Sequence, residues 1–487
     1  MNITSENEAR DRVLTLTGRA GHLVAGALIR GTLEKTVTAP WNHALSVTYK
    51  QVSSDDVQRA ISSAREAFER LRWTNQISDD ASHWLLQMAV AVEAAQADIA
   101  TLISFESGKL LPAAQMEAAA TVASLRYWAE VSIGCETVEE SEEYSTMVVR
   151  SPLGVVAAIT PFNMPLLMMV NKIGPALLSG NSIVCKPAPN TPLTALYFAY
   201  LIAEIVPAGV VNIVANDNAG PILTESSEVD MISFTGSIEV GKTIMASAAA
   251  TVKRLQLELG GNDPAIICED ADLDLVIPKI FQSAFGSAGQ ACVAVKRVYA
   301  HYSVVDEVSR GLAELASESQ PGSPYTSGAT IPTLTTRRQY EYMQELITDS
   351  RERGGEIEYM GKMSDTDGFF AQPTIISNLS VGAPLVEEEQ FSPLLPVVAF
   401  SKVKDVVNSV NQSRFGLGAT VWTRDETKAN YIVDHLESGM VWVNGTGRPS
   451  PAVPFGGVKE SGLGREGGAV GLDAFSEMKT VTFFKKD

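Results

Sequence analysis

The chain has 487 residues, of which 45% are apolar and 20% charged, and its formal net charge is -19. This length and composition predict a folded globular protein of two or three domains. The acidic balance argues against nucleic acid binding, no apolar run is long enough to span a membrane, and the polar N-terminus lacks the apolar core of a signal peptide. We therefore expect a cytoplasmic protein with neither nucleic acid nor membrane as a partner.

In residues 1–130 we expect a loose leader over 1–20 and short strands at 22–30 and 36–50. Helical periodicity predicts helices at 54–71, 79–107 and 112–130, with Asp55 as a candidate N-cap of the first. We expect no chemistry in this region.

From residue 154 the pattern alternates between short apolar runs and helical segments. Helices are expected at 166–178 and 193–205, and strands at 155–160, 181–186, 210–215, 231–234 and 255–259. This alternation predicts a parallel sheet covered on both faces, which binds ligands at the carboxyl ends of its strands. Asn163, Lys186, Gly236 and Ser237 follow strand ends and are therefore site candidates. A second α/β unit is expected to about residue 443, with a loop at 320–330 and strands at 416–422 and 440–444.

The stretch 251–294 contains two candidate catalytic residues. Leu255, Leu257 and Leu259 alternate with polar residues, which predicts a half-buried strand that ends near Glu258. A carboxylate among leucines and glycines should be partly desolvated, which raises its pKa and suits it to proton transfer. Cys292 lies among small residues that leave its sulfur approachable. A surface glutamate and a buried core cysteine are the alternatives.

The four cysteines, Cys135, Cys185, Cys268 and Cys292, are far apart and lack C-x-x-C spacing. A metal site is therefore not expected, and a reducing compartment fits. None of the five histidines lies in a recognisable motif, although a Cys–His pair stays open because such partners can be distant in the chain.

Several further motifs occur in a fixed order. They are TPFNMP from Thr160, KPAPNTP from Lys186, FTGSIEVG from Phe234, ELGG from Glu258, GQAC ending at Cys292, EQFSP from Glu389, Asn444, and PFGGVKESGLGRE from Pro454. This ordered set, with 34 positions between Glu258 and Cys292, resembles the aldehyde dehydrogenase superfamily over roughly residues 20 to 487.

The resemblance implies an α/β fold of two Rossmann-like domains, one for the cofactor and one for catalysis, plus a small β oligomerisation segment. It assigns residues 1–129 and 150–258 to the cofactor domain and 259–444 to the catalytic domain. Residues 130–149 and 474–487 would pair as oligomerisation strands of a homodimer or homotetramer, and 445–473 would form active-site and inter-domain loops. A hairpin within one subunit is the alternative for the acidic, β-prone segment 136–149.

The resemblance also implies NAD(P)-dependent oxidation of an aldehyde to the carboxylic acid. Cys292 would attack the carbonyl, the Asn163 amide would hold the oxyanion, and Glu258 would activate the water that hydrolyses the thioester. Lys172 and Glu466 match positions linked to positioning and proton relay. Asn163 could instead serve turn chemistry.

For the cofactor, the resemblance implies a set of contacts by Thr160, Phe162, Lys186, Gly236, Ser237, Gly241, Leu259, Glu389 and Phe391. Glu389 ends an acidic run and has a solvated surface position as its alternative. Pro189 stands where NAD-specific relatives often carry a glutamate, so NAD is expected and NADP stays open. The loop 216–220 lacks the glycines common in the family, and the absent GxGxxG fingerprint is expected because the superfamily does not use it.

The substrate positions implied by the resemblance are Phe162, Asn171, Ala291, Val293 and Phe455. Arg448 is a candidate for binding a substrate carboxylate, with a solvent-facing loop arginine as the alternative. A CoA-acylating enzyme, a phosphorylating reductase and a non-catalytic binding protein remain as other functions. The presence of Glu258, Cys292 and Asn163 favours the hydrolytic dehydrogenase.

Overall fold

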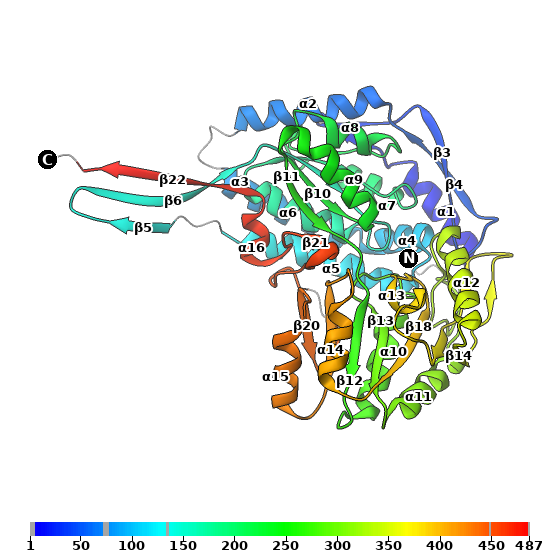
Figure 1. Ribbon diagram of the computed structural model, residues 1–487. Helices are drawn as coiled ribbons and strands as arrows, with labels where there is room; N and C mark the ends of the chain where they lie inside the picture. Colours follow the sequence, from blue (N-terminus) through cyan, green and yellow to red (C-terminus); the bar gives the residue numbers. More distant parts are fainter. Residues whose placement is uncertain (1–4, 72–76, 133–135, 448–449, 486–487) are drawn as a thin grey trace.

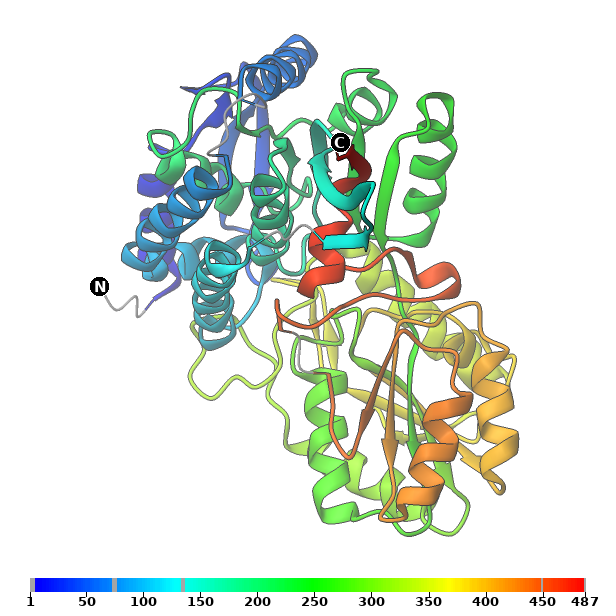
Figure 2. The same ribbon diagram turned by 90° about the vertical axis from the view of Figure 1, so that its left-hand side faces the viewer.

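The computed structural model describes residues 5–71, 77–132, 136–447 and 450–485. Two α/β units lie one above the other, and a narrow β arm projects from the upper unit (Figure 1). The C-terminal segment that contains α16 (Gly468–Asp473) passes between the units (Figure 2). This arrangement confirms the predicted α/β class with two mainly parallel sheets and small antiparallel sheets.

The upper unit is built on an eight-stranded sheet in the order β2-β1-β9-β8-β7-β10-β11-β21. Its strands are β1 (His22–Val24), β2 (Ala27–Ile29), β7 (Val155–Ile159), β8 (Ser182–Lys186), β9 (Val211–Ile213), β10 (Met231–Thr235), β11 (Arg254–Glu258) and β21 (Gly462–Leu463). The strands from β7 to β11 pair in parallel. Their carboxyl ends therefore meet at one edge.

Helices cover both faces of this sheet because successive residues of a strand point to opposite sides. Val155 and Ala157 pack towards α2 (Ser54–Leu71), α8 (Ala219–Glu225) and α9 (Ile238–Ala248). Val156 and Ala158 pack into the larger core on the other side. That core contains α1 (Glu6–Thr17), α3 (Ile77–Ala94), α4 (Gln96–Ser107), α5 (Leu111–Glu130), α6 (Leu167–Leu178) and α7 (Leu193–Ile202).

The lower unit has a seven-stranded sheet in the order β14-β17-β18-β13-β12-β19-β20, with only β14 antiparallel. Its strands are β12 (Asp263–Ile267), β13 (Val295–His301), β14 (Glu356–Tyr359), β17 (Thr374–Ser377), β18 (Leu394–Phe400), β19 (Gly418–Trp422) and β20 (Met440–Val443). Its helices are α10 (Leu273–Phe285), α11 (Val305–Glu318), α12 (Arg337–Glu352), α13 (Pro384–Glu387), α14 (Val403–Asn411) and α15 (Glu426–His435).

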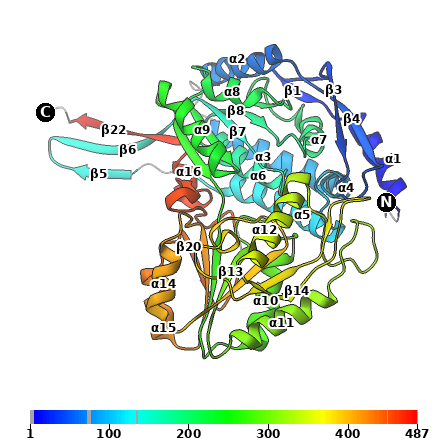
Figure 3. The same ribbon diagram turned by 45° about the vertical axis from the view of Figure 1, so that its right-hand side comes forward.

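Three small antiparallel sheets complete the fold. The arm has the order β22-β6-β5, from β5 (Glu136–Glu140), β6 (Tyr144–Pro152) and β22 (Ser476–Phe484). β6 pairs with the C-terminal strand β22 on one side and with β5 on the other. The pairing with the C-terminus and the hairpin given as its alternative therefore both occur within this one chain. The hairpin of β3 (Leu33–Thr38) and β4 (Ser46–Gln51) lies on the side of the upper unit away from the arm (Figure 3), and β15 (Met363–Ser364) pairs with β16 (Phe370–Ala371).

Four local expectations need correction. The leader expected to be loose over 1–20 contains the helix α1, whose Ala9, Val13 and Leu16 are buried. The helix expected at 79–107 is two helices, α3 and α4, which meet at an angle of 75°. Ser53, and not Asp55, caps α2 and exchanges hydrogen bonds with Asp56, because the helix begins two residues earlier than an Asp55 cap requires. The strand β11 is not half exposed at its end, since Gln256, Leu257 and Glu258 are all buried.

By length and composition, no single helix in the described part of the chain could cross a membrane. The bent pair of α3 and α4 meets that test only jointly, as buried core helices also can.

Candidate active site

Four predicted site residues lie at the shared carboxyl edge of the upper sheet. Thr160 follows β7 and donates its backbone N–H to the carbonyl of Lys186, the last residue of β8, at 3.1 Å. Gly236 follows β10 and donates to the carbonyl of Glu258, the last residue of β11, at 3.0 Å. The parallel register thus brings together residues that are far apart in sequence.

Cys292 lies on the loop between α10 and β13, and Asn163 is bonded directly to this loop. The Asn163 Nδ2 donates to the carbonyl of Gln290 at 3.0 Å. The loop turns through positive φ at Ala288 and Gly289, where a side chain on Gly289 would collide with the backbone of Ser392. Since an amide carries two N–H donors, Asn163 has a second donor that this bond does not use.

Cys292 is partly exposed as a whole residue, whereas Cys185 and Cys268 are buried. Burial raises its pKa to about 12, and the charges of Asp263, Glu389 and Glu258 act in the same direction. Lys296 is the cation that lowers it. A base must therefore take the thiol proton before the sulfur can attack.

Glu258 is buried, and neither of its carboxylate oxygens has a hydrogen-bond partner among the described residues. Burial raises its pKa well above the ordinary value, and the charge of Glu466 raises it further, while Lys172 and Arg465 oppose the shift. A Cβ at Gly456, which has φ of 149°, would lie 2.5 Å from Glu258 Oε1. The surface-glutamate alternative is therefore wrong.

Lys172 and Glu466 form a buried ion pair beside Glu258. Lys172 also donates to Ser233 Oγ at 3.0 Å. Glu466 exchanges two backbone hydrogen bonds of 2.7 Å with Phe455, which precedes Gly456. The two charged residues predicted to act with the base thus contact each other, and their charges act on Glu258.

Glu389 approaches the end of β11 from the lower unit. The N–H of Gly261 donates to its Oε1 at 3.2 Å, and a side chain on Gly260 would collide with its Oε2. Burial raises the pKa of Glu389 to about 7, with Lys296 opposing. A solvated acidic run does not fit these contacts. The glycines after Glu258 therefore make room for a second carboxylate.

The predicted aromatic residues meet at the same place. Phe162 and Phe391 pack edge to face with ring centroids 5.9 Å apart. The Lys296 ammonium lies over the Phe391 ring at 4.7 Å, and Phe391 has a φ of 44°. These contacts join the segment after β7 to the segment before β18.

The remaining cofactor candidates divide into two groups. Ser237 caps α9 by accepting from Val240 N–H, and Gly236 precedes it, so a helix N-terminus faces the strand edge. Gly241 and Leu259 serve packing, because a Cβ at Gly241 would lie 2.6 Å from the Leu259 side chain.

The edge fits a polar ligand such as a nicotinamide dinucleotide. The hydroxyls of Thr160 and Thr235 are buried without a hydrogen-bond partner in the described residues. Lys186 Nζ donates to the carbonyl of Pro187 at 3.1 Å, and burial lowers its pKa. Buried polar groups are costly unless they are satisfied, which favours a site that a bound molecule completes.

Pro189 is exposed, and a different residue supplies negative charge near Lys186. Asp217 follows β9 in the loop that lacks the family's glycines. It accepts from Lys35 Nζ at 2.6 Å and from Gln51 Nε2 at 2.7 Å, and its charge acts on Lys186. The hairpin β3–β4 thus helps to fix the charge at this end of the edge.

The predicted substrate residues are dispersed over several elements. Asn171 lies on α6, where its Oδ1 accepts from Ser124 at 2.7 Å. Val293 lies near Gly447, and Ala291, Val293 and Phe455 are all partly exposed. Arg448 lies outside the described residues.

Three residues that the sequence did not single out contact this site. Lys109 donates to the Asn163 carbonyl at 2.9 Å, so the region before residue 130 is not remote from the chemistry. Gln290 lies inside the GQAC motif, and Lys296 follows Cys292 at a short spacing. Gln290 and Lys296 could have been found from the sequence because they lie close to Cys292, whereas nothing in the sequence marked Lys109.

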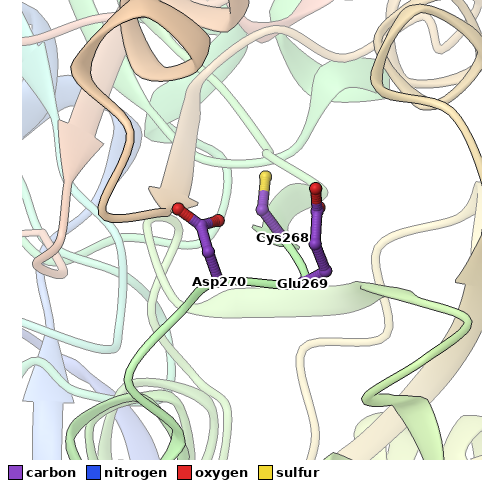
Figure 4. A group of neighbouring side chains, drawn as sticks. All are labelled: Cys268, Glu269 and Asp270. Carbon is purple, nitrogen blue, oxygen red and sulfur yellow. The ribbon is translucent and has the colours of Figure 1, made fainter.

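One group of candidate metal ligands occurs in the described residues, at Cys268, Glu269 and Asp270 (Figure 4). Lys428 Nζ donates to Glu269 at 2.8 Å and to Asp270 at 3.4 Å, and Asp270 also accepts from the Thr423 hydroxyl. These internal bonds account for the group, and it gives no reason to assign a metal.

Known proteins share this fold and sequence. Residues 30–481 match the aldehyde dehydrogenase family. Human aldehyde dehydrogenase 1A1 is 38% identical over 437 residues, covering 88% of this chain and 87% of the human protein. An NADP-dependent enzyme of E. coli superimposes with a TM-score of 0.92 at 33% identity, over 96% of this chain and 98% of that one. Betaine aldehyde dehydrogenase of Staphylococcus aureus, in complex with NAD+, gives 0.92 at 29% identity over 96% of each chain.

Together the fold, the site and these matches define an NAD(P)-dependent dehydrogenase that oxidises aldehydes. The chain belongs to the aldehyde dehydrogenase family.

Proposed function

We propose that the chain oxidises an aldehyde to the free carboxylic acid through a thioester on Cys292, with NAD as the preferred hydride acceptor. The observation that carries the hydrolytic route is Glu258. It is a buried carboxylate with two unpartnered oxygens and a raised pKa, and its charge acts on Cys292. A base held in this way suits the activation of water near neutral pH.

In the first half of the reaction Glu258 would take the proton of the Cys292 thiol and pass it on towards Lys172 and Glu466. The sulfur then forms a bond to the carbonyl carbon, and the carbonyl electron pair moves onto oxygen. The free N–H of the Asn163 amide and the backbone N–H of Cys292 would hold that oxyanion. Bound NAD(P)+ supplies the hydride acceptor, and a thioester remains on Cys292.

In the second half Glu258 takes a proton from water as the water oxygen attacks the thioester carbon. The carbon–sulfur bond breaks, the acid leaves and the Cys292 thiolate returns. Lys172 and Glu466, which contact each other and bias the pKa of Glu258, would position it and pass on its proton.

For the cofactor, Thr160, Lys186, Gly236 and Ser237 would hold the adenosine and pyrophosphate groups, while Glu389, Phe162 and Phe391 would hold the nicotinamide ribose. Asp217 supports a preference for NAD over NADP. Its carboxylate acts on Lys186 and can replace the glutamate that NAD-specific relatives often carry at the position of Pro189. A carboxylate there accepts a ribose hydroxyl and repels a 2′-phosphate.

The test follows reduced nicotinamide by absorbance, with NAD and NADP, across aliphatic, aromatic and carboxylated aldehydes, with and without CoA. We expect turnover that does not need CoA, no signal in C292A, and in E258Q a single-turnover burst without steady turnover. A strict CoA requirement would replace hydrolysis by acyl transfer to CoA. If neither wild type nor C292A forms reduced nicotinamide in response to any aldehyde, the result would support a non-catalytic protein.

A further inference from the structure

Lys109 and Glu117 form a buried ion pair beneath Asn163. Lys109 lies in the turn between α4 and α5 and Glu117 lies in α5, and their side chains are 9% and 1% exposed. Lys109 Nζ donates to the carbonyl of Asn163 at 2.9 Å, and Glu117 Oε1 accepts from the N–H of Leu166 at 3.3 Å. One charge thus holds each end of the turn that carries the Asn163 amide.

These contacts belong to a closed ring of hydrogen bonds that crosses between the two units. Asn163 Nδ2 donates to the Gln290 carbonyl at 3.0 Å, and Gln290 Oε1 accepts from Thr335 N–H at 2.9 Å. Thr335 Oγ1 donates to the Ser107 carbonyl at 2.7 Å, and Ser107 Oγ accepts from Lys109 N–H at 3.3 Å. Lys109 then closes the ring on Asn163.

The ring is tightly supported. Its five residues, with Ser287 and Pro332, line one small cavity between the units. Gly108, which precedes Lys109, has a φ of 80°, and a side chain there would collide with Thr333. Since buried hydrogen-bonded charges resist displacement, the ring fixes both the backbone and the side chain of Asn163.

We propose that Lys109, paired with Glu117, is a positioning residue that sets the Asn163 amide against the Cys292 loop. The inference rests on the proposed function, in which that amide donates to the oxyanion. Lys109 holds the backbone carbonyl of Asn163, and the Gln290 carbonyl holds its side-chain Nδ2, so the second N–H of the side-chain amide is oriented before substrate arrives. A displacement of about 1 Å in such a group can cost about 10²-fold in rate.

The test is a double-mutant cycle on kcat with the full-length enzyme. The variant K109M/E117M removes both charges, so it leaves no unpaired buried ion. It is compared with N163A, with the combined triple variant and with wild type. We expect kcat to fall at least about 10-fold in K109M/E117M with the KM for NAD changed less than about 2-fold. In the N163A background the same pair of changes should alter kcat less than about 2-fold.

A purely structural role would give a different pattern. Equal losses in the wild-type and N163A backgrounds, or wild-type kcat in K109M/E117M, would overturn the inference alone. Wild-type kcat in N163A would remove Asn163 from the proposed function, and the inference with it. R12M, which breaks the partly buried Arg12–Asp98 pair, is the control and should leave kcat unchanged. If K109M/E117M does not fold, E117Q keeps the shape and runs through the same cycle.

Discussion

Glu258, the proposed base, lowers the stability of the folded protein at higher pH. Its pKa in the folded protein lies well above the ordinary value, first because of burial and then because of Glu466. Between the unfolded and folded pKa values the folded state binds more protons than the unfolded state, so stability falls as the pH rises. Glutamine at this position has the same shape but no charge, so it avoids this loss of stability at higher pH.

We therefore expect E258Q to be more stable than wild type, by a margin that grows as the pH rises through the pKa of Glu258. The measurement is thermal unfolding of both proteins at pH 5 and at pH 8. Glu69, an exposed glutamate on α2, provides the control E69Q, whose difference from wild type should not change with pH. A margin for E258Q that shrinks at pH 8 would contradict the buried, protonation-sensitive environment.

Asp217 gives a second prediction at this scale, for cofactor choice. D217N removes a carboxylate beside Lys186 and frees Lys35, and both changes favour a 2′-phosphate. One charge at about 4 Å in water is worth about 1 kcal/mol, so the ratio of kcat/KM for NADP to that for NAD should rise about fivefold.

The matched control is K35M, which leaves Asp217 without its lysine partner and should shift the same ratio towards NAD. Steady-state kinetics with both cofactors measure the two variants. A shift of both in the same direction would show that the charge at this position does not select the cofactor.

At the scale of elements, the N-terminus of α7 has no capping side chain from its own N-cap residue. A residue of α4, Glu106, caps it instead. Glu106 accepts the N–H of Leu193 at 2.6 Å and that of Thr194 at 3.1 Å, and it also accepts the Thr194 hydroxyl. Because α7 follows the segment that carries Lys186 and Pro189, this contact anchors one side of the cofactor edge to the helical layer.

We expect E106A to lose about 2–4 kcal/mol of stability, because two buried N–H groups lose their acceptor. The KM for NAD should rise as well, since the Lys186 segment loses its anchor. Chemical denaturation and cofactor titration check the two effects. E106Q, which retains an acceptor oxygen, should lose less, and equal losses in both variants would point to the charge instead of the cap.

Element types followed from the sequence where periodicity and strand length were clear. The helix at 54–71 and the strand runs from Val155 onwards are present within a residue or two. The break between α3 and α4 was missed because Ala95 lies among good helix formers, with neither proline nor glycine to mark it. The burial of β11 was missed because β21, which covers its outer edge, comes from residues about 200 positions later.

At the scale of the whole molecule, the site depends on contacts that no local pattern encodes. Cys292, Glu258 and Asn163 were placed by motif order, and the structure brings their segments together, while their roles remain proposals. Lys109 carried no signal, because its contact with Asn163 exists only once the α4–α5 turn packs under the edge. The proposed domain boundaries likewise rest on resemblance, beside the two sheets observed.

The β arm leads to the last prediction, which concerns assembly. Both outer strands of its three-stranded sheet, β22 and β5, present unpaired edges. On β22, Met478 and Phe484 are 72% and 77% exposed. An apolar, projecting edge of this kind is rarely left in water, which supports the proposed homo-oligomer.

We expect light scattering to give wild type a molar mass that is a multiple of the chain mass. The mass of M478K/F484K should fall towards that of the single chain. K479Q, on the same strand, should leave the mass unchanged. Since the active-site residues lie in the two α/β units and not on the arm, the dissociated variant should still give a Cys292-dependent burst. A wild-type protein that elutes as a single chain at every concentration would remove oligomerisation as the purpose of the arm.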